Sequence, residues 1–197
     1  MTPNNASPNK NMTQGAMPAS ARPLHNAANN IRPAPSLQGV WRKDFQNSDM
    51  EALTKAVEAM KLGRIQKMAA ISMINGLNVN LNDSRDPSSA TIQYLLKVPT
   101  PFYKIIEQYH QGQETQMQRR DMRAGKQKAV AHSLNAQEMH VELSWSGQLA
   151  GHVNETYKMN SKGQLIVKGV MEVDGEKFVV EQVYNKEDNT PLKSSEC

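Results

Sequence analysis

The sequence is poor in several features that define whole classes of protein. Its single cysteine, Cys197, is the last residue printed, so the chain has neither an intrachain disulfide nor a cysteine cluster for zinc. No run approaches the roughly 18 apolar residues of a membrane-spanning helix, and the first residues lack the apolar segment of a secretory signal. These absences predict a protein of a reducing compartment, and we expect it to be cytoplasmic.

Motifs for catalysis and for metal binding are also lacking. The five histidines show neither His-x-His nor His-Glu-x-x-His spacing. There is no Gly-x-Ser-x-Gly nucleophile motif and no glycine-rich loop of the kind that binds phosphate. The sequence therefore predicts a non-enzymatic protein with no cofactor and no metal site.

Acidic residues are missing from the beginning of the chain up to Asp44. Residues 1–36 are rich in Asn, Pro, Ala and Ser, and their only Lys and Arg are Lys10, Arg22 and Arg32. Such a segment buries too little apolar area to offset the entropy of ordering its backbone, so it is predicted to be a disordered tail. Because transit peptides are also poor in acids, targeting to an organelle through residues 1–36 remains an alternative to a simple spacer.

From Leu37 the pattern changes to short alternating runs separated by turn residues, as is typical of an antiparallel sheet. We expect a first strand over residues 39–45 and then further strands between residues 75 and 184, about ten in all. Asp174-Gly175, between two alternating apolar runs, is the strongest hairpin signal. The pattern predicts an all-β, antiparallel up-and-down barrel over residues 37–187, followed by a flexible C-terminus over residues 188–197.

Two helices are predicted directly after the first strand. Ser48 and Glu51 have the spacing of a capping box, and Gly63 is expected to end the first helix in a left-handed conformation. A second short helix is expected from about Arg64 to Ile71. The first helix carries one apolar stripe, formed by Met50, Leu53, Val57 and Met60. This stripe is either ordinary core packing or the underside of a lid that contacts a ligand.

The last predicted strand carries polar side chains on a largely apolar face. By alternation, Phe178 and Val180 share that face with Gln182 and Tyr184. A few polar groups on an apolar surface are typical of a cavity wall that orients a ligand. The predicted strand over residues 115–122 is polar on both faces, which suits a partly wet barrel better than a dry sandwich core.

The order of these elements resembles that of the intracellular fatty-acid- and retinoid-binding proteins, within the lipocalin superfamily. The similarity covers residues 37–187 and rests on Gly39-Val40-Trp41, on the two helices, and on the stretch from Thr156 to Tyr184. In that family an Arg-x-Tyr on the last strand, and an Arg two strands before it, bind the ligand's head group. Gln182 and Tyr184 correspond to the Arg-x-Tyr, and Tyr157 stands at the other arginine position.

The resemblance implies a carrier that binds one hydrophobic ligand, such as a lipid or retinoid-like molecule, inside the barrel. Paired arginines serve to bind a carboxylate, so their replacement by Gln and Tyr favours a neutral head group, such as an alcohol, aldehyde, ester or ketone. Family members that bind retinol also have glutamine there. The predicted ligand-binding residues are Tyr184, Gln182, Tyr157, Val180, Phe178, Met50, Leu53, Val57 and Met60.

The densest basic run supports an alternative function. It contains Arg119, Arg120, Arg123, Lys126 and Lys128, on two predicted strands joined at Gly125. These residues form either a solvated face or a site for an anionic partner, which would be a phospholipid surface or a nucleic acid. Aromatic residues do not interrupt the run, and this disfavours binding of single-stranded nucleic acid. The alternative is an interaction module with a filled barrel. The oligomeric state does not follow from the sequence.

Overall fold

The computed structural model describes residues 36–83, 86–96, 105–147 and 149–187. They belong to one compact unit, Ala34–Cys197. The predicted tail, apart from Ser36, and the predicted C-terminus lie outside the described residues. Within these ranges, no helix is long and apolar enough to cross a membrane.

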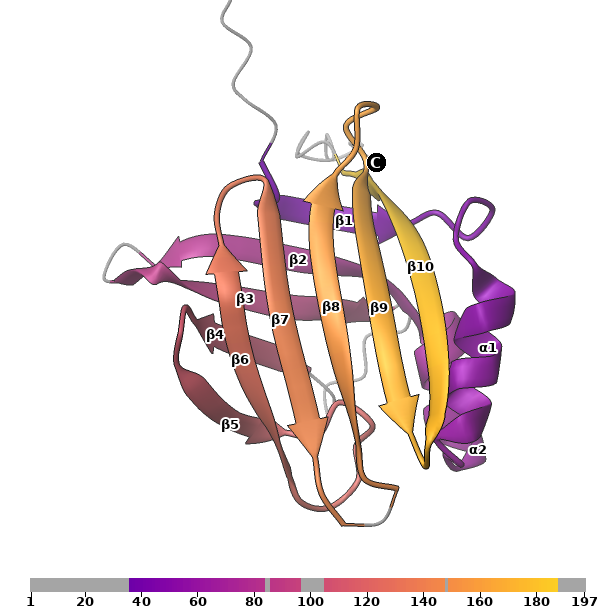
Figure 1. The fold of residues 1–197 in the computed structure, drawn as a ribbon. Coiled ribbons are helices and arrows are strands. Elements are labelled where there is room, and N and C mark those ends of the chain that lie inside the picture. Colours follow the sequence, from indigo (N-terminus) through magenta and orange to yellow (C-terminus); the bar gives the residue numbers. More distant parts are fainter. Residues whose placement is uncertain (1–35, 84–85, 97–104, 148, 188–197) are drawn as a thin grey trace, which may run out of the picture. The chain divides into compact units, whose positions relative to one another are not determined.

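Ten antiparallel strands form one sheet, which confirms the predicted fold class (Figure 1). Their order across the sheet is β4-β3-β2-β1-β10-β9-β8-β7-β6-β5. Strand β1 therefore pairs with β2 on one side and with the last strand, β10, on the other. The bounds are β1 Gly39–Lys43, β2 Ile74–Asp83, β3 Asp86–Leu96, β4 Ile106–His110, β5 Glu114–Gln118, β6 Lys126–Leu134, β7 Glu138–Trp145, β8 Gly151–Met159, β9 Leu165–Val173 and β10 Glu176–Lys186.

The sheet curls into a nearly closed barrel, in which β4 and β5 are the two ends of the strand order. The Thr115 hydroxyl of β5 donates to the Gln108 carbonyl of β4 over 3.3 Å, and the Gly112 amide, in the turn after β4, donates to the Ala131 carbonyl of β6 over 2.8 Å. Individual hydrogen bonds rather than a regular ladder therefore join the sheet at this point, within the part of the chain that is described.

The predicted hairpin at Asp174-Gly175 is confirmed. It links β9 to β10, and both turn residues have positive φ, 54° and 80°. The predicted strand over residues 115–122 is wrong at its C-terminal end, since β5 stops at Gln118. After it the chain turns, and Met122 has a φ of 60°. Because of this turn, Arg119, Arg120 and Arg123 lie between β5 and β6 and not on a strand.

Two helices follow β1, as predicted, but their caps differ from the prediction. Helix α1, Met50–Ala59, is capped by Asp49, whose carboxylate accepts from the Ala52 amide over 2.8 Å. The predicted capping box at Ser48 is wrong, because that hydroxyl is used for tertiary contact instead. It accepts from the Val183 amide over 2.9 Å and so fastens the start of the helix to β10.

The end of α1 also differs from the prediction. Lys61, with a φ of 48°, is the left-handed residue there, and Gly63, with a φ of −61°, instead begins helix α2, Arg64–Met68. The Gly63 amide donates to the Gln66 side chain over 2.9 Å. The chain continues as a π-helix, η1, over Ala69–Met73 before entering β2. Helix α1 lies beside β10 (Figure 1).

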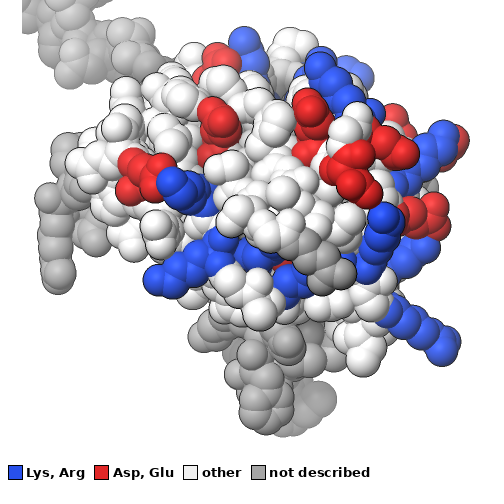
Figure 2. Space-filling model, turned by 60° about the horizontal axis from the view of Figure 1, so that its bottom comes forward, with Lys and Arg blue, Asp and Glu red and all other residues white. Residues whose placement is uncertain are grey.

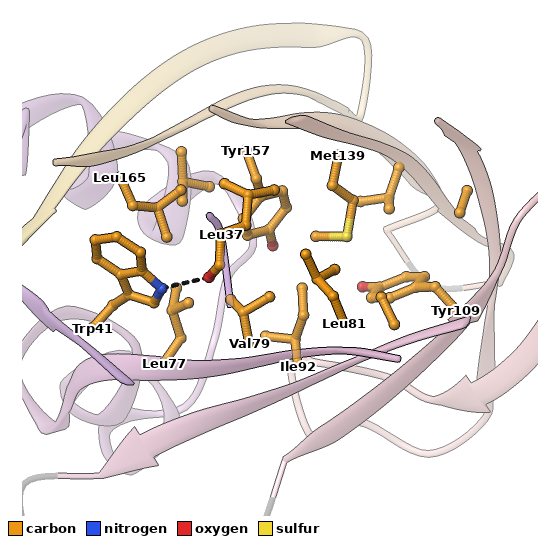
Figure 3. Packing of buried hydrophobic residues seen from close by; sticks show 14 of the residues in the cluster. Leu37, Trp41, Leu77, Val79, Leu81, Ile92, Tyr109, Met139, Tyr157 and Leu165 are labelled. Carbon is orange, nitrogen blue, oxygen red and sulfur yellow. Dashed lines mark hydrogen bonds between the residues drawn. The ribbon is translucent and has the colours of Figure 1, made fainter. Parts of the chain in front are cut away.

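Apolar side chains pack together inside the barrel (Figure 3). Leu37 and Trp41 are completely buried, and the Trp41 indole donates to the Leu37 carbonyl over 2.7 Å. Around them pack inward-facing residues of the other strands, including Leu77, Val79, Leu81, Ile92, Tyr109, Met139, Val141, Tyr157 and Leu165. Burial of this cluster provides the apolar driving force for folding.

Candidate functional site: a cavity at the helix end of the barrel

The barrel is hollow where the helices meet it. Because side chains alternate along a strand, every second residue of a strand faces the barrel interior, and the inward residues near the helices line the space there. Strand β7, for example, contributes Met139, Val141 and Leu143 to the core cluster, and its Leu143 and Trp145 also line a cavity of about 200 Å³. The helical region contributes Leu53, Val57, Met60, Leu62 and Ala70 to the same cavity.

A smaller cavity of about 120 Å³ adjoins the first, between α1 and strands β8 to β10. Both cavities are lined by Leu53, Val57, Met60, Val153, Met171 and Gln182. The smaller one also contacts Ala56, Gly169 and Val180. The larger cavity therefore extends as apolar space along the underside of α1. A bigger hollow, lined by Glu142, His152 and Glu172 among others, involves outward-facing residues of β7 to β9 and is more polar.

Gln182 and Tyr184 lie next to one another on the cavity wall. The Tyr184 hydroxyl donates to the Gln182 Oε1 atom over 3.0 Å. That bond occupies the amide oxygen, so the Gln182 Nε2 group still has N–H donors for another acceptor. Burial raises the pKa of Tyr184. Its hydroxyl is therefore neutral at physiological pH, and this polar pair carries no charge.

Lys43, at the end of β1, is a cation on the same wall. It points inward because it follows Trp41 by two residues, and only 8% of it is exposed. Among the described residues, no carboxylate lies within ion-pair distance of its ammonium group. Burial lowers the pKa of Lys43 from 10.5 to about 8. The sequence offered this signal, since alternation from Trp41 predicts the inward position.

A charged network lies beside the cavity and is centred on Arg120. Its guanidinium donates to Glu107 on β4 over 2.9 and 2.8 Å, and to Glu155 on β8 over 2.6 and 3.1 Å. Gln127 accepts from the Arg120 amide over 2.9 Å and donates to Glu107 over 3.1 Å. Arg120 follows β5, so its bond to Glu107 joins the two ends of the sheet.

Three tyrosines complete this network. Tyr109 and Tyr94 donate to Glu107 over 2.6 and 3.2 Å, and Tyr157 donates to Glu155 over 2.7 Å. Burial by itself would raise the pKa of Glu107, but the Arg120 guanidinium and these donors hold it below its usual value. Burial, with the nearby carboxylates, raises the pKa of all three tyrosines. The network thus holds two carboxylates around one guanidinium.

The other two arginines of the basic run also have protein partners. Arg119 is buried, binds the Asp121 carboxylate over 3.0 and 2.6 Å, and stacks over Trp145 with 5.5 Å to the ring centroid. Arg123 donates to the carbonyls of Met60 and Lys61 over 2.6 and 2.9 Å. It thereby fastens the C-terminal end of α1 to the turn between β5 and β6.

The structure brings most of the predicted ligand-binding residues to this site, while their role in binding stays a prediction. Gln182, Tyr184, Leu53, Val57 and Met60 line the larger cavity, and Val180 lines the smaller one. Among the residues lining these two cavities in the described part of the chain, Met50, Phe178 and Tyr157 do not occur. Tyr157 belongs to the Arg120 network instead.

The basic face that was expected on two joined strands is not a cluster of exposed guanidinium groups, because Arg119, Arg120 and Arg123 all bind other groups of the protein. Lys126 and Lys128 are its exposed members, and Lys128 contacts Glu114 over 3.1 Å. Figure 2 shows basic and acidic side chains close together over much of the face that it displays. Within the described ranges, no group of three or more His, Cys, Asp and Glu residues is placed to hold a metal ion.

Comparison with known proteins identifies the fold. A solved structure, "As-p18, an extracellular fatty acid binding protein", matches with a TM-score of 0.51 and 12% sequence identity, over 76% of this chain and 95% of that chain. The fold is a fatty-acid-binding-protein-like barrel. At this identity the likeness shows the fold alone, and it supports such a barrel in general rather than the intracellular family in particular. No family model and no curated protein sequence matches the chain.

Proposed function

We propose that this fatty-acid-binding-protein-like barrel binds a small, mostly apolar ligand in the cavity under α1. The observation that carries the proposal is the division of the barrel's interior. Most of the interior is packed with apolar side chains, whereas the helix end leaves space that is lined by ten apolar residues and eight polar or charged ones. Such a lining is typical of a site where apolar burial supplies affinity and hydrogen bonds supply orientation.

The size of the space favours a compact ligand. A cavity of about 150 Å³ accommodates benzene, and drug-sized ligands occupy roughly 300–1,000 Å³. The larger cavity here measures about 200 Å³ and the adjoining one about 120 Å³. An eight-carbon chain is therefore a suitable first probe, with its tail lying along the underside of α1.

The charges around the cavity favour a neutral head group next to Arg120. This guanidinium already binds Glu107 and Glu155, so a ligand carboxylate placed there would be repelled by two carboxylates. Gln182 and Tyr184 instead offer neutral hydrogen-bonding groups. Lys43 is the cation that an acid would approach, and comparison of octanol with octanoate tests this point directly.

A cavity-filling variant tests the proposal. Val153 faces the cavity, and Val153→Phe should reduce binding of 1-octanol at least tenfold by occupying the space. His152, its outward-facing neighbour on β8, provides the matched control: His152→Phe should leave binding unchanged. Binding is measured by displacement of a fluorescent apolar probe, with thermal unfolding as a check that both variants fold.

A series of straight-chain alcohols adds a quantitative criterion. Each buried CH₂ contributes about 0.8 kcal/mol, which corresponds to about a fourfold gain in affinity per carbon. The gain should continue until the cavity is full and then stop. Alcohols that show no such dependence on length, or that bind Val153→Phe as tightly as the natural sequence, would refute a ligand-binding cavity.

A further inference from the structure

Lys43 is the cavity residue whose chemistry goes beyond simple binding of an apolar molecule. Its side chain is in the wall of the larger cavity, together with Leu53, Val57 and Met60 of α1. Its ammonium nitrogen lies 5.8 Å from the ring centroids of both Phe45 and Tyr184. The lysine therefore ends among aromatic and aliphatic groups and not beside an acid.

The other titratable groups of this cavity do not provide Lys43 with a counter-ion. Asp121 binds Arg119, and Arg120 binds carboxylates outside the cavity lining. Tyr94 and Tyr184 remain neutral because burial raises their pKa. Among the described side chains, Arg123 Nη1 is the fully buried polar atom that has no hydrogen bond. The Lys43 nitrogen also has no hydrogen-bond partner among the described residues, but it is not fully buried, so its surface remains partly accessible.

This environment makes the free amine available at neutral pH. A pKa of about 8, compared with 10.5 for an ordinary lysine, raises the fraction of uncharged amine at pH 7 about 300-fold. A desolvated lysine in an apolar pocket is the usual form of an amine nucleophile toward carbonyl compounds.

The neighbouring polar pair is suited to a carbonyl group. Lys43 pairs directly with Tyr184 across β1 and β10, and Gln182 is the next inward residue along β10. Because its Oε1 atom accepts from Tyr184, Gln182 keeps amide N–H donors for an acceptor oxygen. A carbonyl oxygen is such an acceptor, and a hydrogen bond to it polarises its C=O bond toward attack.

We propose that the preferred ligands include small apolar aldehydes and that Lys43 holds them as a reversible imine. The inference rests on the proposed function, since the aldehyde's chain would occupy the same cavity. The Lys43 nitrogen adds to the carbonyl carbon, and proton transfer from nitrogen to oxygen gives a carbinolamine. Loss of water then forms the C=N bond. No oxidant or reductant is consumed, and hydrolysis by water returns the amine and the aldehyde.

Reductive trapping tests the inference. The full-length protein is incubated with octanal and cyanoborohydride at pH 7, and the modified lysines are located by peptide mass spectrometry. We expect at least tenfold faster labelling at Lys43 than at exposed lysines such as Lys55 and Lys162. Labelling of Lys43 should rise with pH and level off above about pH 8, whereas labelling of the exposed lysines should still increase.

Two variants and one further ligand separate the possible results. Lys43→Met should abolish the fast labelling, whereas Lys55→Arg, on the exposed face of α1, should leave both the labelling of Lys43 and the binding of 1-octanol unchanged. Labelling of Lys43 no faster than that of Lys55 overturns the imine, and the proposed function stands if octanol still binds. Failure of octanol to bind overturns the proposed function, whatever the labelling shows.

Discussion

Replacement of Arg120 by methionine should destabilise the fold strongly, because it removes the guanidinium that binds both Glu107 and Glu155. Glu107 is 1% exposed and Glu155 10%, so neither carboxylate can recover full hydration. Removing one partner of a buried ion pair costs about 3–5 kcal/mol. Because Arg120 itself is 26% exposed, we expect a loss near the lower limit, about 3 kcal/mol.

The pH dependence of this loss gives a sharper criterion. In the natural sequence the pKa of Glu107 is lowered, so its stabilising contribution is present above the unfolded-state pKa and disappears as the pH falls through the folded-state value. Without Arg120, burial would instead raise the pKa of Glu107. The folded variant would then take up a proton, and acidification from pH 7.5 to 5.5 should reduce its deficit, by at most about 1.4 kcal/mol per pH unit.

Urea unfolding followed by tryptophan fluorescence, at both pH values, measures these free energies. Lys128→Met, which removes an exposed ion pair with Glu114, is the control and should cost at most about 1 kcal/mol. A triple variant that adds Glu107→Gln and Glu155→Gln to Arg120→Met should regain most of the stability, because no unpaired charge remains. A deficit below about 1 kcal/mol for Arg120→Met, or an equal deficit at both pH values, would refute this account.

Two other variants examine helix α1 and the pair formed by Gln182 and Tyr184. Arg123→Met removes the donors to the Met60 and Lys61 carbonyls. The local stability of α1 should fall by about 1.5–3 kcal/mol, which amide hydrogen exchange in α1 would show as faster exchange. Unchanged exchange would contradict the idea that Arg123 holds the end of this helix in place. Gln182→Leu should weaken 1-octanol about three- to tenfold while leaving a hydrocarbon of the same length unaffected, measured by probe displacement. Equal weakening of both ligands would argue against a role in binding the head group.

Local patterns in the sequence were sufficient to predict the fold. Alternation placed Val141 and Leu143 on the inner face, and Asp174-Gly175 marked the hairpin between β9 and β10. The helix caps were less predictable, because Ser48 is used for tertiary contact with Val183, a residue far away in the sequence. A capping motif shows only local possibilities, and a distant partner decides between them.

The candidate site was predicted only in part, for the same reason. The apolar stripe of α1 and the pair Gln182 and Tyr184 followed from periodicity. The position of Arg120 did not, because the chain turns after Gln118 where a continuing strand was expected. Its partners Glu107 and Glu155 lie 13 and 35 residues away in the sequence. Alternation indicates which side of a strand a residue occupies, but not which residue faces it across the barrel.

The cavity wall and the hydrophobic core of this barrel share residues. Val153 lines both cavities and is also a member of the core cluster, and Met171 packs against that cluster. Substitutions at these two positions should therefore change the shape of the cavity and the free energy of unfolding together. Variants that reshape the cavity need a measurement of folding stability beside every measurement of binding.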